Sequence, residues 1–200
     1  MIKSSQFAKS VSEKLGKFLA WLPLHPNSIT ILSVLMAALA YFTWGISIVS
    51  QIQALILFLF AFFFDAVDGA IARAKSLTTK EGAFLDGISD RLVEFFVVLA
   101  LLKTAPGLQL PLITILFFGT AMTAFVKAYA EHAQLLSHED ALKMPGLMER
   151  TERSLLLLAA MVLFMFNSQN IFAIVVYFTA VMSVLTFIQR FAIAYLKIKL

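Results

Sequence analysis

Long apolar stretches recur along this 200-residue chain and constrain its fold more than any other feature. Six can be distinguished, over residues 28–48, 52–72, 82–102, 111–130, 154–166 and 171–195. A transmembrane helix needs about 20 predominantly apolar residues, and only the stretch at 154–166 is clearly shorter. We include that stretch because six spans place the charges of the loops in a consistent order. The sequence therefore predicts an all-α integral membrane protein with six transmembrane helices.

The overall composition excludes several other classes of protein. Hydrophobic residues make up 60% of the chain and charged residues 14%, whereas soluble domains have about 45–50% and about 25%. Disordered chains combine low hydrophobicity with high charge, which is the opposite pattern. The chain contains no cysteine, so disulfides, thiolate nucleophiles and zinc–thiolate sites are excluded.

The basic residues indicate how the chain is oriented in the membrane. With six spans, both termini and the loops after the second and fourth spans lie on one side. The basic residues of that side and its helix ends are Lys3, Lys9, Lys14, Lys17, Arg73, Lys75, Lys80, Arg91, Lys127, Lys143, Arg150, Arg153, Arg190, Lys197 and Lys199. Only Lys103 lies on the other side. The positive-inside rule makes the first side cytoplasmic, and the net charge of +4 then indicates membrane orientation rather than a nucleic-acid partner.

Residues 1–22 have the pattern of a helix that lies in the membrane interface. Apolar residues recur there at helical spacing and lysines fall between them, as in amphipathic interfacial helices. We therefore divide the chain into an interfacial helix over 1–22 and a six-helix transmembrane catalytic domain over 23–200. Ser28 or Thr30 is expected to cap the first span. Thr78 and Glu81 fit a capping box that begins the third span.

Four aspartates in the second and third spans carry the strongest functional signal. Asp65 and Asp68 are three residues apart, and Asp86 and Asp90 are four apart. Each pair therefore shares one face of its helix. The two helices are consecutive and antiparallel, and at ~1.5 Å per residue both pairs reach a similar depth from the cytoplasmic side. The sequence thus predicts that the four carboxylates meet inside the membrane.

A carboxylate near the bilayer centre costs about 2.5–3.5 kcal/mol on insertion scales, so four together require compensation. Asp oxygens are hard ligands that suit Mg²⁺ or Mn²⁺, and two divalent cations would neutralise four negative charges. Two cations about 3.5–4 Å apart are a known arrangement for displacement at phosphorus. The alternative, in which the acids only cap helices or join them, explains this helical spacing poorly.

The spacing of these residues resembles the complete signature of the CDP-alcohol phosphotransferase family, D-x2-D-G-x2-A-R-x8-G-x3-D-x3-D, read from Asp65 to Asp90. The likeness extends over nearly the whole chain and includes the Pro-Asn-x-Ile-Thr stretch at 26–30. The family transfers a phosphatidyl-type group from a CDP-linked lipid to an alcohol and releases CMP. The resemblance also implies a homodimer in the cell membrane, with the active site facing the cytoplasm.

The resemblance assigns a role to each residue of the motif. The metal ligands would be Asp65, Asp68, Asp86 and Asp90, holding two divalent cations. Asp90 would also be the catalytic base that takes the proton of the acceptor hydroxyl. The CDP-binding residues would be Asp68, Gly69, Ala72, Arg73 and Gly82, with Arg73 on the phosphates.

A second group of basic residues bears on the acceptor alcohol. Lys127 lies at the cytoplasmic end of the fourth span, and Arg150 and Arg153 precede the fifth. A phosphorylated acceptor is a dianion that needs such a pocket, and paired arginines suit phosphate geometry. These segments are similar to those of phosphatidylinositol-phosphate and archaetidylinositol-phosphate synthases, which use inositol 1-phosphate. Ordinary positive-inside charge is the alternative explanation of the three cations.

Two other functions remain open at this level. Glycerol 3-phosphate is a competing acceptor for the same chemistry, with either a diacyl or an archaeal diether lipid as donor. A divalent-cation transporter would also place acids within the membrane. A transporter needs polar residues through the outer half of the membrane, but residues 52–64 are almost wholly apolar, which favours the enzyme.

Overall fold

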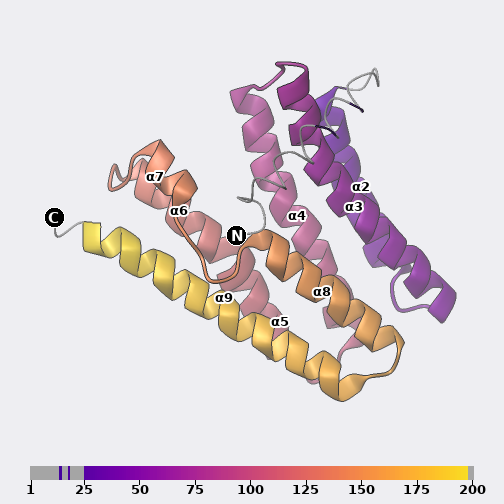
Figure 1. The fold of residues 1–200 in the computed structure, drawn as a ribbon. Coiled ribbons are helices and arrows are strands. Elements are labelled where there is room, and N and C mark those ends of the chain that lie inside the picture. Colours follow the sequence, from indigo (N-terminus) through magenta and orange to yellow (C-terminus); the bar gives the residue numbers. More distant parts are fainter. Residues whose placement is uncertain (1–13, 15–17, 19–24, 198–200) are drawn as a thin grey trace. The chain divides into compact units, whose positions relative to one another are not determined.

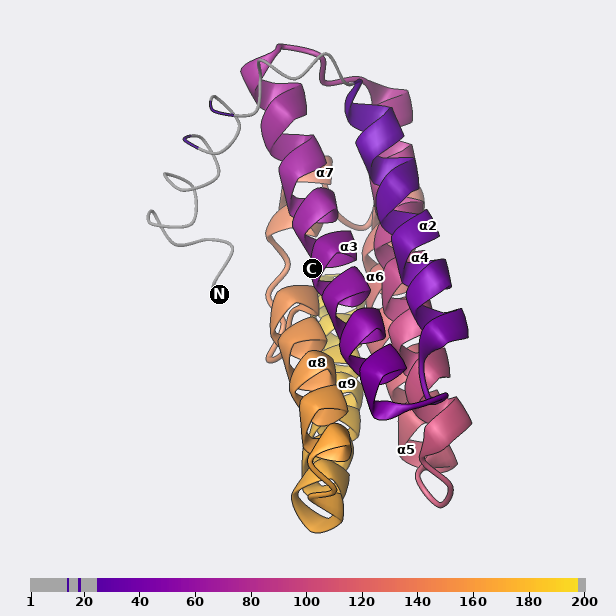
Figure 2. The ribbon, with the colours of Figure 1, turned by 90° about the vertical axis from the view of Figure 1, so that its right-hand side faces the viewer.

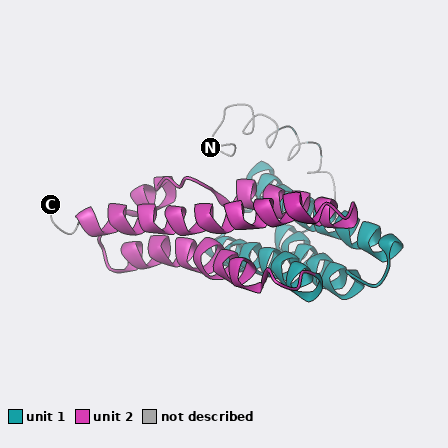
Figure 3. Cartoon of the chain, turned by 90° about the horizontal axis from the view of Figure 1, so that it is seen from below, with its two compact units in different colours: residues 1–104 teal, residues 105–200 magenta. Residues whose placement is uncertain are grey.

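The computed structural model describes residues 14, 18 and 25–197, and all regular elements in this range are helices. The all-α prediction is therefore confirmed for the described part of the chain. The interfacial helix predicted for 1–22 lies outside the described residues, apart from the two isolated positions. The chain divides into two compact units, residues 1–104 and 105–200 (Figure 3), which are described separately.

Over residues 25–104, unit 1 comprises α2 (Pro26–Thr43), α3 (Ile48–Ala74) and α4 (Lys80–Thr104). Figures 1 and 2 show the three helices side by side, and α2 contacts both of the others. Small side chains allow this close packing, because Ala37 and Ala40 of α2 and Ala54 and Ala61 of α3 are fully buried. Small residues at such interfaces are typical of helices packed within a membrane.

The helix starts of unit 1 differ slightly from those predicted. Pro26 occupies the first turn of α2 and His25 Nδ1 accepts from the Asn27 amide at 3.3 Å, so Ser28 and Thr30 lie inside the helix and do not cap it. At the start of α4, Thr79 Oγ1 accepts from the Gly82 amide at 3.0 Å. The predicted cap at Thr78 is therefore wrong by one residue, because the adjacent hydroxyl of Thr79 caps the helix without a glutamate three residues later.

Trp44, directly after the last residue of α2, is fully buried and fixes the end of unit 1 at which α2 and α4 both end. Its Nε1 donates to Thr104 Oγ1 at 2.9 Å, and Lys103 Nζ donates to its carbonyl at 2.9 Å. Gly45 follows with φ of +89°, and a Cβ there would lie 2.7 Å from Thr104 Cγ2. These contacts join the end of α2 to the end of α4 and thereby fix how the three helices align.

Unit 2 begins with a continuous helical run that changes type along its length. This run comprises α5 (Gln109–Thr114), the π-helix η2 (Ile115–Met122) and α6 (Thr123–His132). The remaining helices are α7 (His138–Lys143), α8 (Arg150–Met165) and α9 (Gln169–Lys197). The long helix α9 contacts α5, η2, α6 and α8, so it is the element around which unit 2 is built.

In the part of the chain that the structure describes, four helical segments are long and apolar enough to cross a membrane: Pro26–Thr43, Ile48–Ala74, Gln109–His132 and Gln169–Leu196. Large apolar side chains on their outer faces are exposed, for example Phe42, Phe60 and Ile174. Such extensive apolar exposure is unfavourable in water and suits a lipid environment. The predicted third and fifth spans correspond to α4 and α8, which are outside this set because α4 contains several charged residues and α8 has only 16 residues.

Candidate active site

Three of the four aspartates come together in unit 1. The antiparallel helices α3 and α4 are joined by residues 75–79 (Figure 1), and the acids lie on both helices near this connection. One carboxylate oxygen from each of Asp65, Asp86 and Asp90 lies within 4.8 Å of the other two, and all three residues are partly buried. The predicted meeting of the four carboxylates is therefore seen for three of them.

Asp68 is not part of that cluster. It is only 3% exposed and accepts hydrogen bonds from Thr30 Oγ1 of α2 and from the Gly69 amide. Since residues of a helix rise ~1.5 Å each, Asp68 lies nearly one turn closer to the helix end than Asp65, where the Thr30 hydroxyl is within reach. Its predicted role as a metal ligand stays a prediction.

The cluster of Asp65, Asp86 and Asp90 fits a divalent cation. Oxygen ligands lie about 2.0–2.1 Å from Mg²⁺, so ligands on opposite sides of the ion are about 4 Å apart. Separations of up to 4.8 Å therefore allow the three carboxylates to bind one ion after small side-chain movements. An all-oxygen, anionic donor set selects Mg²⁺, Mn²⁺ or Ca²⁺ over softer metals.

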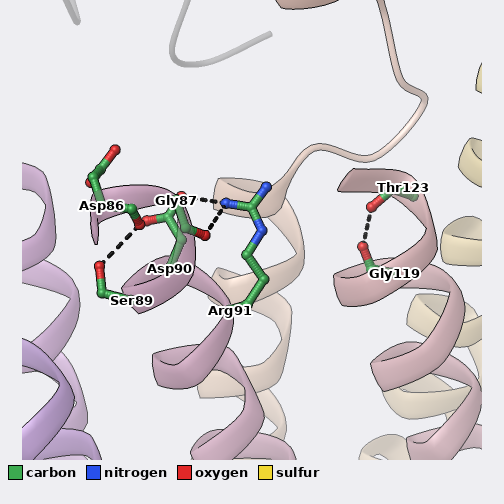
Figure 4. Close-up of polar contacts among 7 residues, drawn as sticks. All are labelled: Asp86, Gly87, Ser89, Asp90, Arg91, Gly119 and Thr123. Atoms are coloured by element: carbon green, nitrogen blue, oxygen red, sulfur yellow. Dashed lines mark hydrogen bonds and ion pairs between the residues drawn. The ribbon is translucent and has the colours of Figure 1, made fainter. Parts of the chain in front are cut away.

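Asp90 is oriented by the arginine that follows it. Arg91 Nη1 donates to the Gly87 carbonyl at 2.7 Å and to Asp90 Oδ2 at 3.3 Å, while Ser89 Oγ donates to the Asp86 carbonyl at 3.0 Å (Figure 4). The Asp90 side chain is 14% exposed. Arg91 was expected only as one of the cytoplasmic basic residues, because consecutive residues of a helix do not normally face each other.

A cavity of about 170 Å³ lies beside the acids within unit 1. Its lining includes Asp68, Gly69, Ala72, Arg73 and Gly82, the five residues expected to bind CDP, together with Asp86. Asn27 and Thr30 of the 26–30 stretch also line it, a place that was not predicted for either side chain.

The glycines keep this cavity open. A Cβ on Gly82 would lie 3.3 Å from Asn27 Oδ1 and 3.2 Å from Thr79 Oγ1, and one on Gly69 would lie 3.4 Å from Arg73 Nη1. A side chain at Gly82 would therefore push against Asn27 and Thr79, whereas a Cβ on Gly69 would only reach ordinary contact distance from Arg73.

The three basic residues predicted to bind the acceptor all belong to unit 2. Arg150 and Arg153 lie in the first turn of α8, three residues apart and therefore on one face. The positive end of a helix dipole favours anions, so both arginines and the helix start contribute positive potential, which Glu149 and Glu152 of the capping box partly offset. Arg153 is only 3% exposed, whereas Lys127 on α6 and Arg150 are partly buried.

Unit 2 contains a second buried arginine, Arg190, which was predicted only to be one of the cytoplasmic charges. Arg190 of α9 is 8% exposed. Its Nη1 donates to the Thr123 carbonyl at 3.2 Å and its Nε to the Pro145 carbonyl at 3.4 Å. Burial of an arginine so near the end of an apolar helix is not evident from hydropathy, so its sequence context offered no signal.

Comparison with known proteins gives a consistent result. A family model described as CDP-alcohol phosphatidyltransferase matches residues 23–188. The chain is 34% identical over 183 residues to the archaetidylinositol phosphate synthase of Pyrococcus horikoshii, covering 91% of this chain and 89% of that protein.

Two solved structures of the phosphatidylinositol phosphate synthase of Mycobacterium tuberculosis share the fold, each with a TM-score of 0.74. One has CDP-DAG bound, is 23% identical and covers 93% of this chain and 94% of that chain. The other is in complex with manganese and citrate, is 22% identical and covers 92% and 88% of the two chains. The likeness shows that the described helices form a multi-pass integral membrane fold.

Proposed function

Because the chain belongs to the CDP-alcohol phosphatidyltransferase family, we propose that it transfers a phosphatidyl-type group from a CDP-linked lipid to inositol 1-phosphate and releases CMP. One observation carries the proposal: three carboxylates converge near a cavity lined by the remaining residues of the family motif. The archaetidylinositol phosphate synthase that is 34% identical supports an inositol phosphate as the acceptor.

Unit 1 supplies the chemistry in this proposal. Asp65, Asp86 and Asp90, with Asp68 beside them, would hold two divalent cations, Mg²⁺ or Mn²⁺. Bound cations would polarise the diphosphate and offset the charge that develops on the departing CMP. The guanidinium of Arg73 would bind the phosphates of the CDP-linked lipid.

Asp90 acts as the base. The acceptor hydroxyl loses its proton to the Asp90 carboxylate while its oxygen bonds to the phosphorus next to the lipid. The bond from that phosphorus to the bridging oxygen breaks, and CMP leaves with this oxygen. Arg91, which donates to Asp90, keeps the carboxylate oriented, because a base must lie within hydrogen-bonding reach of the proton it removes.

Unit 2 supplies recognition of the acceptor. Lys127, Arg150 and Arg153 would bind the phosphate dianion, and Arg190 is a fourth candidate because it is a buried cation in the same unit. Guanidinium groups bind phosphate through paired hydrogen bonds. A neutral acceptor such as free inositol would gain nothing from this charge.

We also propose that α4 and α8 cross the membrane, which gives six spans, and that residues 23–200 act as one catalytic domain. The polar face of α4 would then lie inside the protein rather than against lipid, as intramembrane acids generally do. The basic loops support a site on the cytoplasmic side of the cell membrane. A homodimer follows from the family resemblance alone.

An acceptor panel tests the function. Purified protein in detergent would receive a CDP-linked lipid, Mg²⁺ and one of four alcohols: inositol 1-phosphate, free inositol, glycerol 3-phosphate or glycerol. We expect CMP release with inositol 1-phosphate to exceed that with free inositol by at least about a hundredfold, because the loss of two charged hydrogen bonds costs about 3 kcal/mol or more.

The panel also separates the alternatives. Turnover with glycerol 3-phosphate instead would keep the transferase and replace the acceptor. Equal rates with inositol and its phosphate would contradict a phosphate-binding role for the basic residues. A cation transporter, which would require no nucleotide, would release no CMP with any acceptor.

A further inference from the structure

The π-helix η2 contains Gly119, which packs against Arg153 in unit 2. The Thr123 amide donates to the Phe118 carbonyl, five residues back, rather than to the Gly119 carbonyl as in an α-helix. The Thr123 hydroxyl donates to the Gly119 carbonyl instead (Figure 4). π-helical turns are rare and often occur at functional sites, so this irregularity requires an explanation.

The explanation lies in what packs against Gly119. A Cβ on Gly119 would be 2.9 Å from Cδ and 3.1 Å from Nε of Arg153, and 2.7 Å from Ser183 Oγ. These separations are shorter than normal packing contacts, so a methyl group at this position would force Ser183 or Arg153 to shift. Neither neighbour can move easily: Arg153 is 3% exposed, and fully buried Ser183 donates to the Thr179 carbonyl at 2.8 Å.

The contact involves the middle of the arginine side chain, which sets the direction of the guanidinium. Because this group is planar and its donors have fixed directions, a small displacement of Cδ or Nε rotates the donors away from a phosphate. The π-helical turn brings the Cα of Gly119 against this part of Arg153.

We propose that Gly119 is a positioning residue for Arg153, and that η2 exists to place a residue without a side chain at this point. Arg153 then presents its guanidinium in the orientation that the acceptor phosphate requires. This inference rests on the proposed function, because it assumes that Arg153 binds the phosphorylated acceptor.

Kinetics of Gly119→Ala test the inference, with inositol 1-phosphate and a CDP-linked lipid varied separately. We expect the KM for inositol 1-phosphate to rise about tenfold, which corresponds to the loss of one charge-assisted hydrogen bond. The KM for the CDP-linked lipid should change by less than about twofold, because binding of the donor does not involve Arg153. Alanine favours helices over glycine, so any loss arises from the added methyl group.

Ala121→Val is the matched control, because it adds methyl groups to an exposed position of the same π-helix. It should leave both KM values and the melting temperature unchanged. If Gly119→Ala folds poorly, Thr123→Val is the second variant: it removes the hydroxyl that donates to the Gly119 carbonyl at nearly constant volume. It should raise the same KM, by less.

Arg153→Gln, alone and combined with Gly119→Ala, separates the positioning role of Gly119 from the phosphate-binding role of Arg153. The double variant should be no worse than Arg153→Gln, because Gly119 acts only through Arg153. Additive effects, or a rise in both KM values with a lower melting temperature, would overturn the positioning role. If only Arg153→Gln raises the acceptor KM, the inference fails and the proposed function stands. If Arg153→Gln leaves that KM unchanged, Arg153 does not bind the acceptor and the inference fails. The proposed function itself fails only if the parent protein releases no CMP with inositol 1-phosphate.

Discussion

Asp90→Asn is expected to reduce the rate of CMP release by about 10²–10⁴-fold, the contribution of a positioned base. The amide has nearly the same shape as the carboxylate but cannot accept the proton of the acceptor hydroxyl. It also removes one negative charge from the cluster of Asp65, Asp86 and Asp90, which weakens cation binding. Saturating Mg²⁺ or Mn²⁺ restores cation occupancy, so the loss that persists at saturation measures the role of Asp90 as base.

Asp140→Asn is the matched control, since Asp140 is an exposed aspartate at the start of α7. It makes the same chemical change away from the site and should leave turnover unchanged. Both variants should melt and elute from a sizing column like the parent protein. Near-normal turnover by Asp90→Asn at saturating metal would show that another group takes the proton.

Removal of divalent cations should stop the reaction. Three carboxylates within 4.8 Å of one another repel each other and also repel the diphosphate of the donor. Metal ions contribute several kcal/mol to such reactions, and each ~1.4 kcal/mol is tenfold in rate, so excess EDTA should slow CMP release by at least about a hundredfold.

Adding Mg²⁺ or Mn²⁺ back to the stripped protein should restore the rate. EDTA already saturated with Mn²⁺ is the control for effects of the chelator itself and should not inhibit. CMP quantified by chromatography provides the readout. An unchanged rate in excess EDTA would exclude a metal-dependent transfer.

Much of unit 1 could be predicted because its pattern is local. Positions three or four residues apart share a helix face, and a short connection between α3 and α4 makes them antiparallel, so the cluster of Asp65, Asp86 and Asp90 follows from spacing. The hydrogen bond from Thr30 to Asp68 joins residues 38 apart in the chain. Helical periodicity does not encode such a contact. The spacing therefore predicted one cluster of four acids and could not show that Asp68 bonds to Thr30 instead.

The details of unit 2 were harder to predict. Apolar content predicts a helix near 111–130 but cannot reveal that η2 is π-helical, because this depends on which carbonyl the Thr123 amide selects. The roles of Gly119 and buried Arg190 depend on packing between helices, which hydropathy does not report. Apolar stretches together with the order of the loop charges predicted six spans, whereas four helical segments among the described residues meet length and composition requirements.

Binding of Mn²⁺, followed by electron paramagnetic resonance as free ion is lost, tests most directly whether the carboxylates of unit 1 form a metal centre. The parent protein should bind Mn²⁺ in competition with Mg²⁺. The triple variant Asp65→Asn, Asp86→Asn and Asp90→Asn should bind at least about a hundredfold more weakly, since it has lost three anionic ligands. Glu139→Gln, which changes an exposed acid on α7, should bind like the parent. Equal affinity and stoichiometry for the triple variant and the parent would contradict the account.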